Sequence, residues 1–166
     1  MILGMSLPVF TAVHVLVSLA ALAAGVPLIV GFLKSRDVKY VTVSFLTLTT
    51  ATSVTGFLFP ATQLLPSHIT GIISLAVLAL AGAALRVFHT RGAWRVAYVV
   101  CAVIAFYLNT FVAVVQAFLK VPGLHDLAPT GTEPPFLAVQ VAVLLAFVAV
   151  GFVSVKRFHP ALPSAA

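Results

Sequence analysis

The sequence predicts an all-α integral membrane protein with five transmembrane helices, in which two helical hairpins form a pseudo-symmetric four-helix bundle and the fifth helix is peripheral. Two observations carry this prediction. Of the 166 residues, 62% are hydrophobic and 7% are charged, whereas roughly 25% of residues are charged in soluble domains. Charges and prolines also divide the chain into five apolar stretches, each near the roughly 20 residues that cross a bilayer as a helix. A water-soluble globular domain is therefore excluded.

The predicted spans form a single transmembrane domain over residues 1–166 and lie at about 9–33, 40–60, 67–88, 95–119 and 135–155. The first stretch is long, has no basic segment before it and leads directly into a second span. We therefore expect a retained helix rather than a cleaved signal peptide.

Lys and Arg residues predict the orientation of these spans. One side of the predicted membrane collects Lys34, Arg36, Lys39, Arg86, Arg91, Arg95, Lys156 and Arg157, and Lys120 lies on the other. Under the positive-inside rule the N-terminus is outside and the C-terminus is cytoplasmic. The net charge of +6 is then a topology signal, and it predicts a lipid bilayer rather than nucleic acid as the partner.

The longest predicted connection covers residues 120–134 on the outer side and is rich in Pro, Gly and Thr. Its prolines restrict the backbone, and Leu124, Leu127 and Phe136 offer apolar contacts. We expect an ordered loop that caps the outer mouth of the bundle.

Spans one to four resemble two copies of one hairpin, each with an outer histidine followed by a basic inner turn. Such parallel repeats are related by an axis along the membrane normal, which would place His14 opposite His68. Both lie at a similar depth, because His14 is 20 residues from Lys34 and His68 is 18 residues from Arg86. At the same outer level, the fourth span carries Gln116.

One stripe of the fourth span is predicted to face the other helices, because its members alternate spacings of four and three. The stripe comprises Tyr98, Ala102, Ala105, Asn109, Val112 and Gln116. Asn109 and Gln116 are expected to hydrogen-bond to neighbouring helices, since an unpaired amide is costly in lipid. The hydroxyl-rich second span can satisfy its side chains on its own carbonyls.

Several activities are disfavoured by what the spans lack. No Asp, Glu, Lys or Arg lies in the middle of a predicted span, which argues against a proton-coupled transporter or a retinal pigment. No GxSxG, HExxH or phosphate-binding loop occurs. The single cysteine, Cys101, excludes an internal disulfide and a thiolate metal cluster. No catalytic residue can be assigned, and whether the chain is an enzyme stays open.

The outer polar residues are the remaining candidates for a site. A single b-type haem between His14 and His68, near Gln116 and Asn109, fits their depth and the small residues below each histidine, because imidazole is a common haem ligand. A metal ion held by His14 and His68 would recruit His125 or Glu133 from the loop. Two alternatives stay open: an accessory or assembly subunit that binds a membrane partner or a second copy, and a quinone or lipid site using Gln116, Asn109 and Tyr98.

Five strings across the chain are similar to those of small bacterial inner-membrane proteins of unknown function: TGFLFP (55–60), LPSHITGIISL (65–75), GAWRVAYV (92–99), LNTFVAVVQAF (108–118) and LAPTGTEPPF (127–136). This resemblance implies an inner-membrane location and brings no activity with it. The hairpin pattern also loosely resembles membrane cytochromes of the b type. A ladder of four histidines is absent, so a two-haem electron path is not expected.

Overall fold

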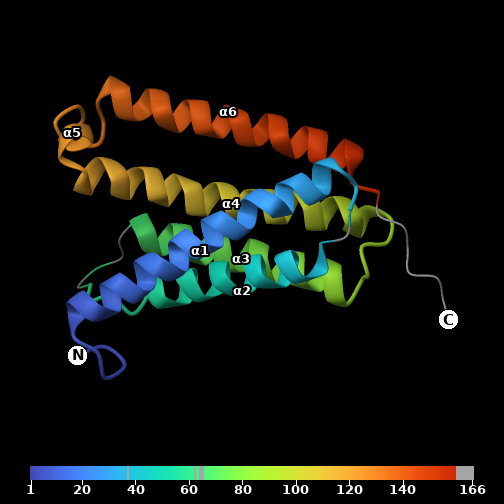
Figure 1. Ribbon diagram of the computed structural model, residues 1–166, viewed down its shortest axis with the longest axis horizontal. Helices are drawn as coiled ribbons and strands as arrows, with labels where there is room; N and C mark the ends of the chain where they lie inside the picture. The colour runs from blue at the N-terminus through green and yellow to red at the C-terminus, as the bar shows by residue number, and fades with distance from the viewer. Residues whose placement is uncertain (37, 62, 64–65, 160–166) are drawn as a thin grey trace.

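The computed structural model describes residues 1–36, 38–61, 63 and 66–159, and the regular elements of these residues are helices (Figure 1). Their bounds are α1 (Leu7–Leu33), α2 (Lys39–Gly56), α3 (Pro66–Arg86), α4 (Ala93–Lys120), the short α5 (Pro122–His125) and α6 (Pro134–Arg157). The all-helical class is confirmed. Four of the five predicted spans agree with these helices to within two residues at each end.

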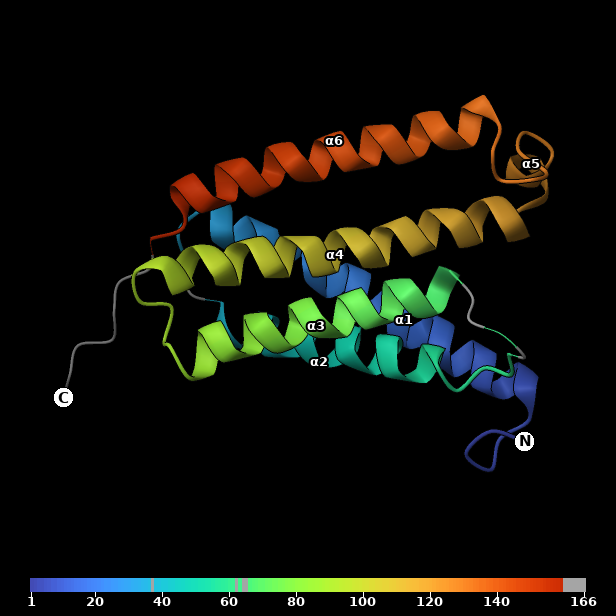
Figure 2. The same cartoon turned by 180° about the vertical axis from the view of Figure 1, so that it is seen from behind.

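The long helices lie side by side along the long axis of the molecule, so their connections gather at two ends (Figures 1 and 2). One end holds the N-terminus, the α2–α3 connection and α5, and we call it the loop end. The opposite end holds the α1–α2 and α3–α4 connections and the last turn of α6. We call it the basic end, because eight cations lie in or beside these segments while Lys120 lies at the loop end.

Four helices contact one another in a closed ring, and α6 lies outside it. Among the described residues α1 packs on α2, α2 on α3, α3 on α4 and α4 on α1, whereas α1 and α3 share no contact. The helices α1 and α3 are thus diagonal to each other, and α2 touches α4 across the other diagonal. The helix α6 packs on α4 and α1 and buries Gln140 and Ser154. The pseudo-symmetry of the two hairpins stays a prediction.

The helix α4 is the central element, because it contacts every other helix. The inward stripe predicted from the sequence is confirmed for four members, Tyr98, Ala102, Ala105 and Asn109, all of which are buried. The prediction that Gln116 faces a neighbouring helix is wrong, since its side chain is exposed. Beyond Asn109 the next buried residue of α4 is Phe118, which packs edge-on against Phe136 at 5.3 Å between ring centroids.

Four helices, α1, α3, α4 and α6, are long and apolar enough to cross a membrane. The helix α2 is shorter, with 18 residues, and ends before the predicted bound because the chain turns at Phe57 ahead of Pro60. Its low hydropathy has a plain origin: Ser or Thr occupies positions 42, 44, 47, 49, 50, 52, 53 and 55.

The hydroxyl groups of α2 pair with three different neighbours. Thr42 Oγ1 lies 3.0 Å from the Tyr98 hydroxyl of α4, and Ser53 Oγ donates to Ser74 Oγ of α3 at 3.0 Å. Thr55 Oγ1 lies 2.8 Å from His14 Nδ1 of α1. These three hydroxyls are therefore paired with partners on other helices, which offsets the cost of placing them in an apolar surrounding.

Thr49 and Thr52 are exceptions, because their buried hydroxyls have no hydrogen-bond partner among the described residues, and Thr49 is the more deeply buried. We expect Thr49→Val to leave the free energy of unfolding unchanged or to raise it by up to about 1 kcal/mol, since the isosteric change removes an unpaired polar atom. Unfolding in mixed micelles measures this. The matched control is Thr42→Val, which breaks the bond to Tyr98 and should cost about 1 kcal/mol. A larger loss in Thr49→Val than in Thr42→Val would contradict the prediction.

Candidate functional site

The imidazole of His14 is held by a two-step hydrogen-bond relay near the loop end. His14 lies on the second turn of α1, is half-buried, and its Nδ1 lies 2.8 Å from Thr55 Oγ1 on the last turn of α2. The Thr55 hydroxyl in turn donates to the Ala51 carbonyl at 2.7 Å. The antiparallel packing of α1 on α2 brings these residues together from 41 positions apart.

This relay favours one tautomer of His14. A threonine hydroxyl has one hydrogen, and a carbonyl oxygen can only accept. When the Thr55 hydrogen is donated to the Ala51 carbonyl, the Thr55 oxygen accepts from His14, and Nδ1 then carries the proton of the neutral ring. Nε2 then holds a lone pair, and no hydrogen bond engages it among the described residues. His14 Nε2 is therefore an acceptor or a metal ligand with a fixed orientation.

Aromatic rings and a glycine surround the His14 imidazole. The ring of Phe59 meets it edge-on at 5.1 Å between centroids, and Phe59 packs in the same way on the buried Phe10 at 5.1 Å. A Cβ on Gly56 would lie 3.9 Å from His14 Cε1. We call His14, Thr55, Gly56, Phe59 and Phe10 the His14 site. Apart from the imidazole and the hydroxyl, the side chains of this site are apolar, and two of them are aromatic rings.

His68 lies on α3, diagonal to α1, and has a different neighbour. Its ring stacks on Phe57 at 5.6 Å between centroids and 12° between planes. Gly71 makes room for this arrangement, since a Cβ there would come within 2.9 Å of the Phe57 ring. The segment from Thr55 to Phe59 thus contacts both histidines, His14 through Thr55 and Phe59 and His68 through Phe57. A haem shared by His14 and His68 stays a prediction.

The part that Gln116 and Asn109 play in this site stays a prediction. Gln116 is exposed, and Asn109 is buried with its Nδ2 unpaired. Tyr98, the third residue of the predicted quinone site, lies one turn and a half into α4 from the basic end. Its contact with Thr42 places it in the bundle core away from His14.

The loop residues named as extra metal ligands, His125 and Glu133, have different surroundings. His125 ends α5 and is exposed, while Glu133 precedes α6 and turns back on its own loop. One Glu133 oxygen accepts from Thr130 N at 3.0 Å and Thr130 Oγ1 at 2.9 Å, and the other from Thr132 N at 3.0 Å. In the part of the chain that the structure describes, no three His, Cys, Asp or Glu side chains form a metal-binding group. The helix α5 packs on α4.

The hydrogen bond from the Thr130 amide is the largest of the contacts that lower the pKa of Glu133, to about 2 from the ordinary 4.5. At a pH above the ordinary pKa of 4.5, the hydrogen bonds of the ionised carboxylate contribute fully to the stability of the turn. This contribution is lost as the pH falls from about 4.5 toward 2. We expect a carboxyl carbon resonance of Glu133 to titrate near pH 2.

Thr130→Ala is the partial control for this titration, because it removes the hydroxyl donor and keeps the amide. Its midpoint should rise only part of the way to the ordinary value. A titration midpoint near 4.5 for Glu133 in the wild type would contradict the proposed stabilisation of the turn by the carboxylate.

Sequence reasoning found His14 but missed the residues that orient it, Thr55 and Phe59. A signal was present: Thr55 is 16 residues from Lys39, or about 24 Å along a helix, which approaches the roughly 30 Å for His14. Counting residues from the basic end for hydroxyl groups as well as for amides would have placed Thr55 at a depth similar to that of His14.

Comparisons with known proteins assign no family and no activity. No protein-family model matches the chain, and neither the curated proteins nor the solved structures contain a match. The described residues form an all-helical protein with four helices long and apolar enough to cross a membrane and a hydrogen-bonded histidine near one end.

Proposed function

We propose that this chain is a five-span protein of a bacterial inner membrane, with its basic end in the cytoplasm and its N-terminus outside. The helix α2 is the fifth span. Its hydroxyls pair with α1, α3 and α4, and its 18 residues cover about 27 Å, close to the roughly 30 Å hydrocarbon layer.

Labelling of single introduced cysteines tests this topology, with the buried Cys101 replaced by Ala. Cysteines at Ser35 and Gly92 should react from the cytoplasmic side, and cysteines at Ala61 and Gly123 from the outside. Reaction of positions 35 and 61 from the same side would show that α2 does not cross.

We further propose that the His14 site binds a membrane-soluble ring compound through a hydroxyl group, with a quinol as the concrete class. The observation that carries this proposal is the relay from His14 through Thr55 to Ala51. It leaves the Nε2 lone pair to accept a hydrogen bond, and the flat rings of Phe59 and Phe10 suit an aromatic ligand.

The relay also predicts which redox form of the ligand binds. A quinol offers O–H donors, which the Nε2 lone pair can accept, whereas the carbonyl oxygens of a quinone can only accept. A quinone facing Nε2 would leave two acceptors unpaired, and burial of an unpaired polar group costs about 1–3 kcal/mol. Each 1.4 kcal/mol is a tenfold change in affinity. The reduced form should therefore bind about tenfold more tightly.

Binding of a short-tailed benzoquinol and of its quinone to the purified protein tests the proposal. We expect the quinol to bind more tightly, and His14→Ala to remove this preference. His68→Ala is the matched control and should keep it. Equal affinities for both forms, or a preference that survives in His14→Ala, would overturn the proposal.

A single b-type haem between His14 and His68 is the second candidate. Two features favour it: α1 and α3 are diagonal in the ring of helices, and a ligating histidine commonly donates its other ring nitrogen to a nearby acceptor, as His14 does to Thr55. An absorbance spectrum with metal analysis separates the candidates. A Soret band lost in both His14→Ala and His68→Ala supports haem.

The absence of a Soret band from freshly purified protein would exclude the haem. Co-purification of a fixed membrane partner, with function unchanged in His14→Ala, would instead favour an accessory subunit.

A further inference from the structure

An apolar groove runs between α1 and α6, on the outside of the helical ring. It is lined by Val26, Ile29, Val30, Phe106, Ala146, Phe147 and Val150 and has a volume of about 230 Å³. Phe106 is buried and lies at the floor, whereas Val26 and Val30 are exposed at the wall. Pockets for drug-sized ligands have roughly 300–1,000 Å³, so this groove has room for a smaller apolar group such as part of an acyl chain. We call it the α1–α6 groove.

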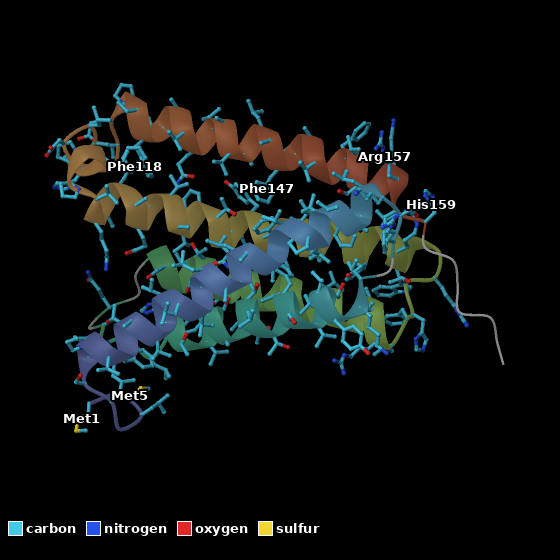
Figure 3. All side chains as sticks on the ribbon, viewed as in Figure 1. Met1, Met5, Phe118, Phe147, Arg157 and His159 are labelled. Atoms are coloured by element: carbon cyan, nitrogen blue, oxygen red, sulfur yellow. The ribbon has the colours of Figure 1, made fainter. Side chains whose placement is uncertain are left out.

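The groove is a fixed feature of the packing. Phe106 meets Phe147 edge-on at 5.1 Å between centroids, so α4 and α6 are joined by aromatic contact beneath it; Figure 3 labels Phe147 on the side of α6 that faces α4. The helix α1 comes close to this ring at Gly25, where a Cβ would lie 2.5 Å from Phe106. Three helices therefore set the walls and the floor.

Cations lie just beyond the groove at the basic end. Lys34 caps α1 one turn after Val30, about 6 Å along the axis, and Arg157 follows Val150 by two turns of α6, about 10 Å. Both are exposed, as is Lys156; Figure 3 labels Arg157 at this end of α6. The described acidic residues, Asp126 and Glu133, belong to the loop end. No ion pair joins these cations to another described residue; Lys156 Nζ lies over the Phe152 ring at 4.3 Å from its centroid.

We infer that the α1–α6 groove and these cations form a binding site for one anionic phospholipid of the leaflet at the basic end. An acyl chain fills the groove, and the headgroup phosphate lies against Lys34 and Arg157. Charge complementarity selects this occupant, because basic pockets between helices bind anionic headgroups while a wholly apolar lining rejects a polar ligand.

Thermal unfolding of the purified protein with added lipid tests the site. Phosphatidylglycerol should raise the unfolding midpoint by about 3 °C more than phosphatidylcholine with the same chains, since a ligand that binds only the folded state stabilises it. Inorganic phosphate alone should give no rise, because it has no chain to fill the groove. Equal shifts with both lipids, or a full shift with phosphate alone, would overturn the inference.

Two pairs of variants locate the site. Ala146→Phe fills the groove and should remove the shift, whereas Ala149→Phe, an exposed position outside the lining, should keep it. The double variant Lys34→Gln with Arg157→Gln should lose the preference for the anionic lipid, and Lys120→Gln at the loop end should retain it. The charge variants change exposed side chains and should fold normally. They therefore test the site even when Ala146→Phe does not fold. Loss of the preference in Lys120→Gln to the same degree would contradict the proposed location.

Discussion

Gly25→Ala is expected to lower the free energy of unfolding by about 1–3 kcal/mol, the usual cost of overpacking a filled core. The added Cβ would lie 2.5, 2.6 and 2.7 Å from three carbons of the Phe106 ring. This ring also meets Phe45 at 5.9 Å and Phe147 at 5.1 Å between centroids, so a shift that relieves the clash must disturb one of these contacts or move the ring into the α1–α6 groove that it lines. Unfolding in mixed micelles measures the loss.

Gly82→Ala is the matched control, because it is also a helical glycine and a Cβ there meets nothing within 4 Å. It should be neutral or stabilising by up to about 1 kcal/mol, since alanine restricts the unfolded chain more than glycine does. Phe106→Leu should rescue part of the loss in the double variant, because contacting residues couple energetically. Equal effects of Gly25→Ala and Gly82→Ala would show that α1 does not approach α4 at this position.

Thr55→Val is expected to weaken quinol binding by about three- to tenfold and to abolish the preference for quinol over quinone. The change removes the oxygen that accepts from His14 Nδ1, so the proton is free to move to Nε2 and the lone pair is lost from the binding side. One hydrogen bond is worth about 0.5–1.5 kcal/mol. Thr55→Ser keeps the hydroxyl and should retain the preference.

Nitrogen NMR of the His14 ring checks the cause of this effect without any ligand. In the wild type the proton should reside on Nδ1, and in Thr55→Val both tautomers should be populated. A wild-type ring protonated on Nε2 would contradict the relay, and with it the preference for the reduced ligand. The tautomer and the ligand affinity are thus measured independently.

The predicted helices agreed with the structure wherever the signal was local. The bounds of α1, α3, α4 and α6 follow from apolar length and flanking charges, because each segment must satisfy its backbone within itself. The stripe from Tyr98 to Asn109 followed from helical spacing alone. Gln116 continues the same spacing, but no residue of α4 between Asn109 and Phe118 is buried. Periodicity predicts which face of a helix points inward, but not how far along the helix that face is covered.

The candidate site was predicted only in part, because its polar groups come from separate helices. His14 stood out as a histidine at a defined depth, whereas Thr55 was one hydroxyl among many in α2. Similarly, nothing in the sequence linked Gly56 and Phe57 to the histidines. In the structure, the end of α2 and the turn after it place Gly56 near His14 and Phe57 against His68. Contacts of this kind depend on how one helix is rotated against another, which hydropathy does not encode.

By itself the sequence determined that this chain is a set of apolar helices with one basic end, since hydrophobicity and charge act residue by residue. The tertiary structure decided the rest. It made α4 the central helix, and it gave three hydroxyls of α2 partners on three different helices. It also oriented His14 through a residue 41 positions away. The physical reason is that a hydrogen bond needs both groups within about 3 Å, and helix packing alone brings distant residues that close.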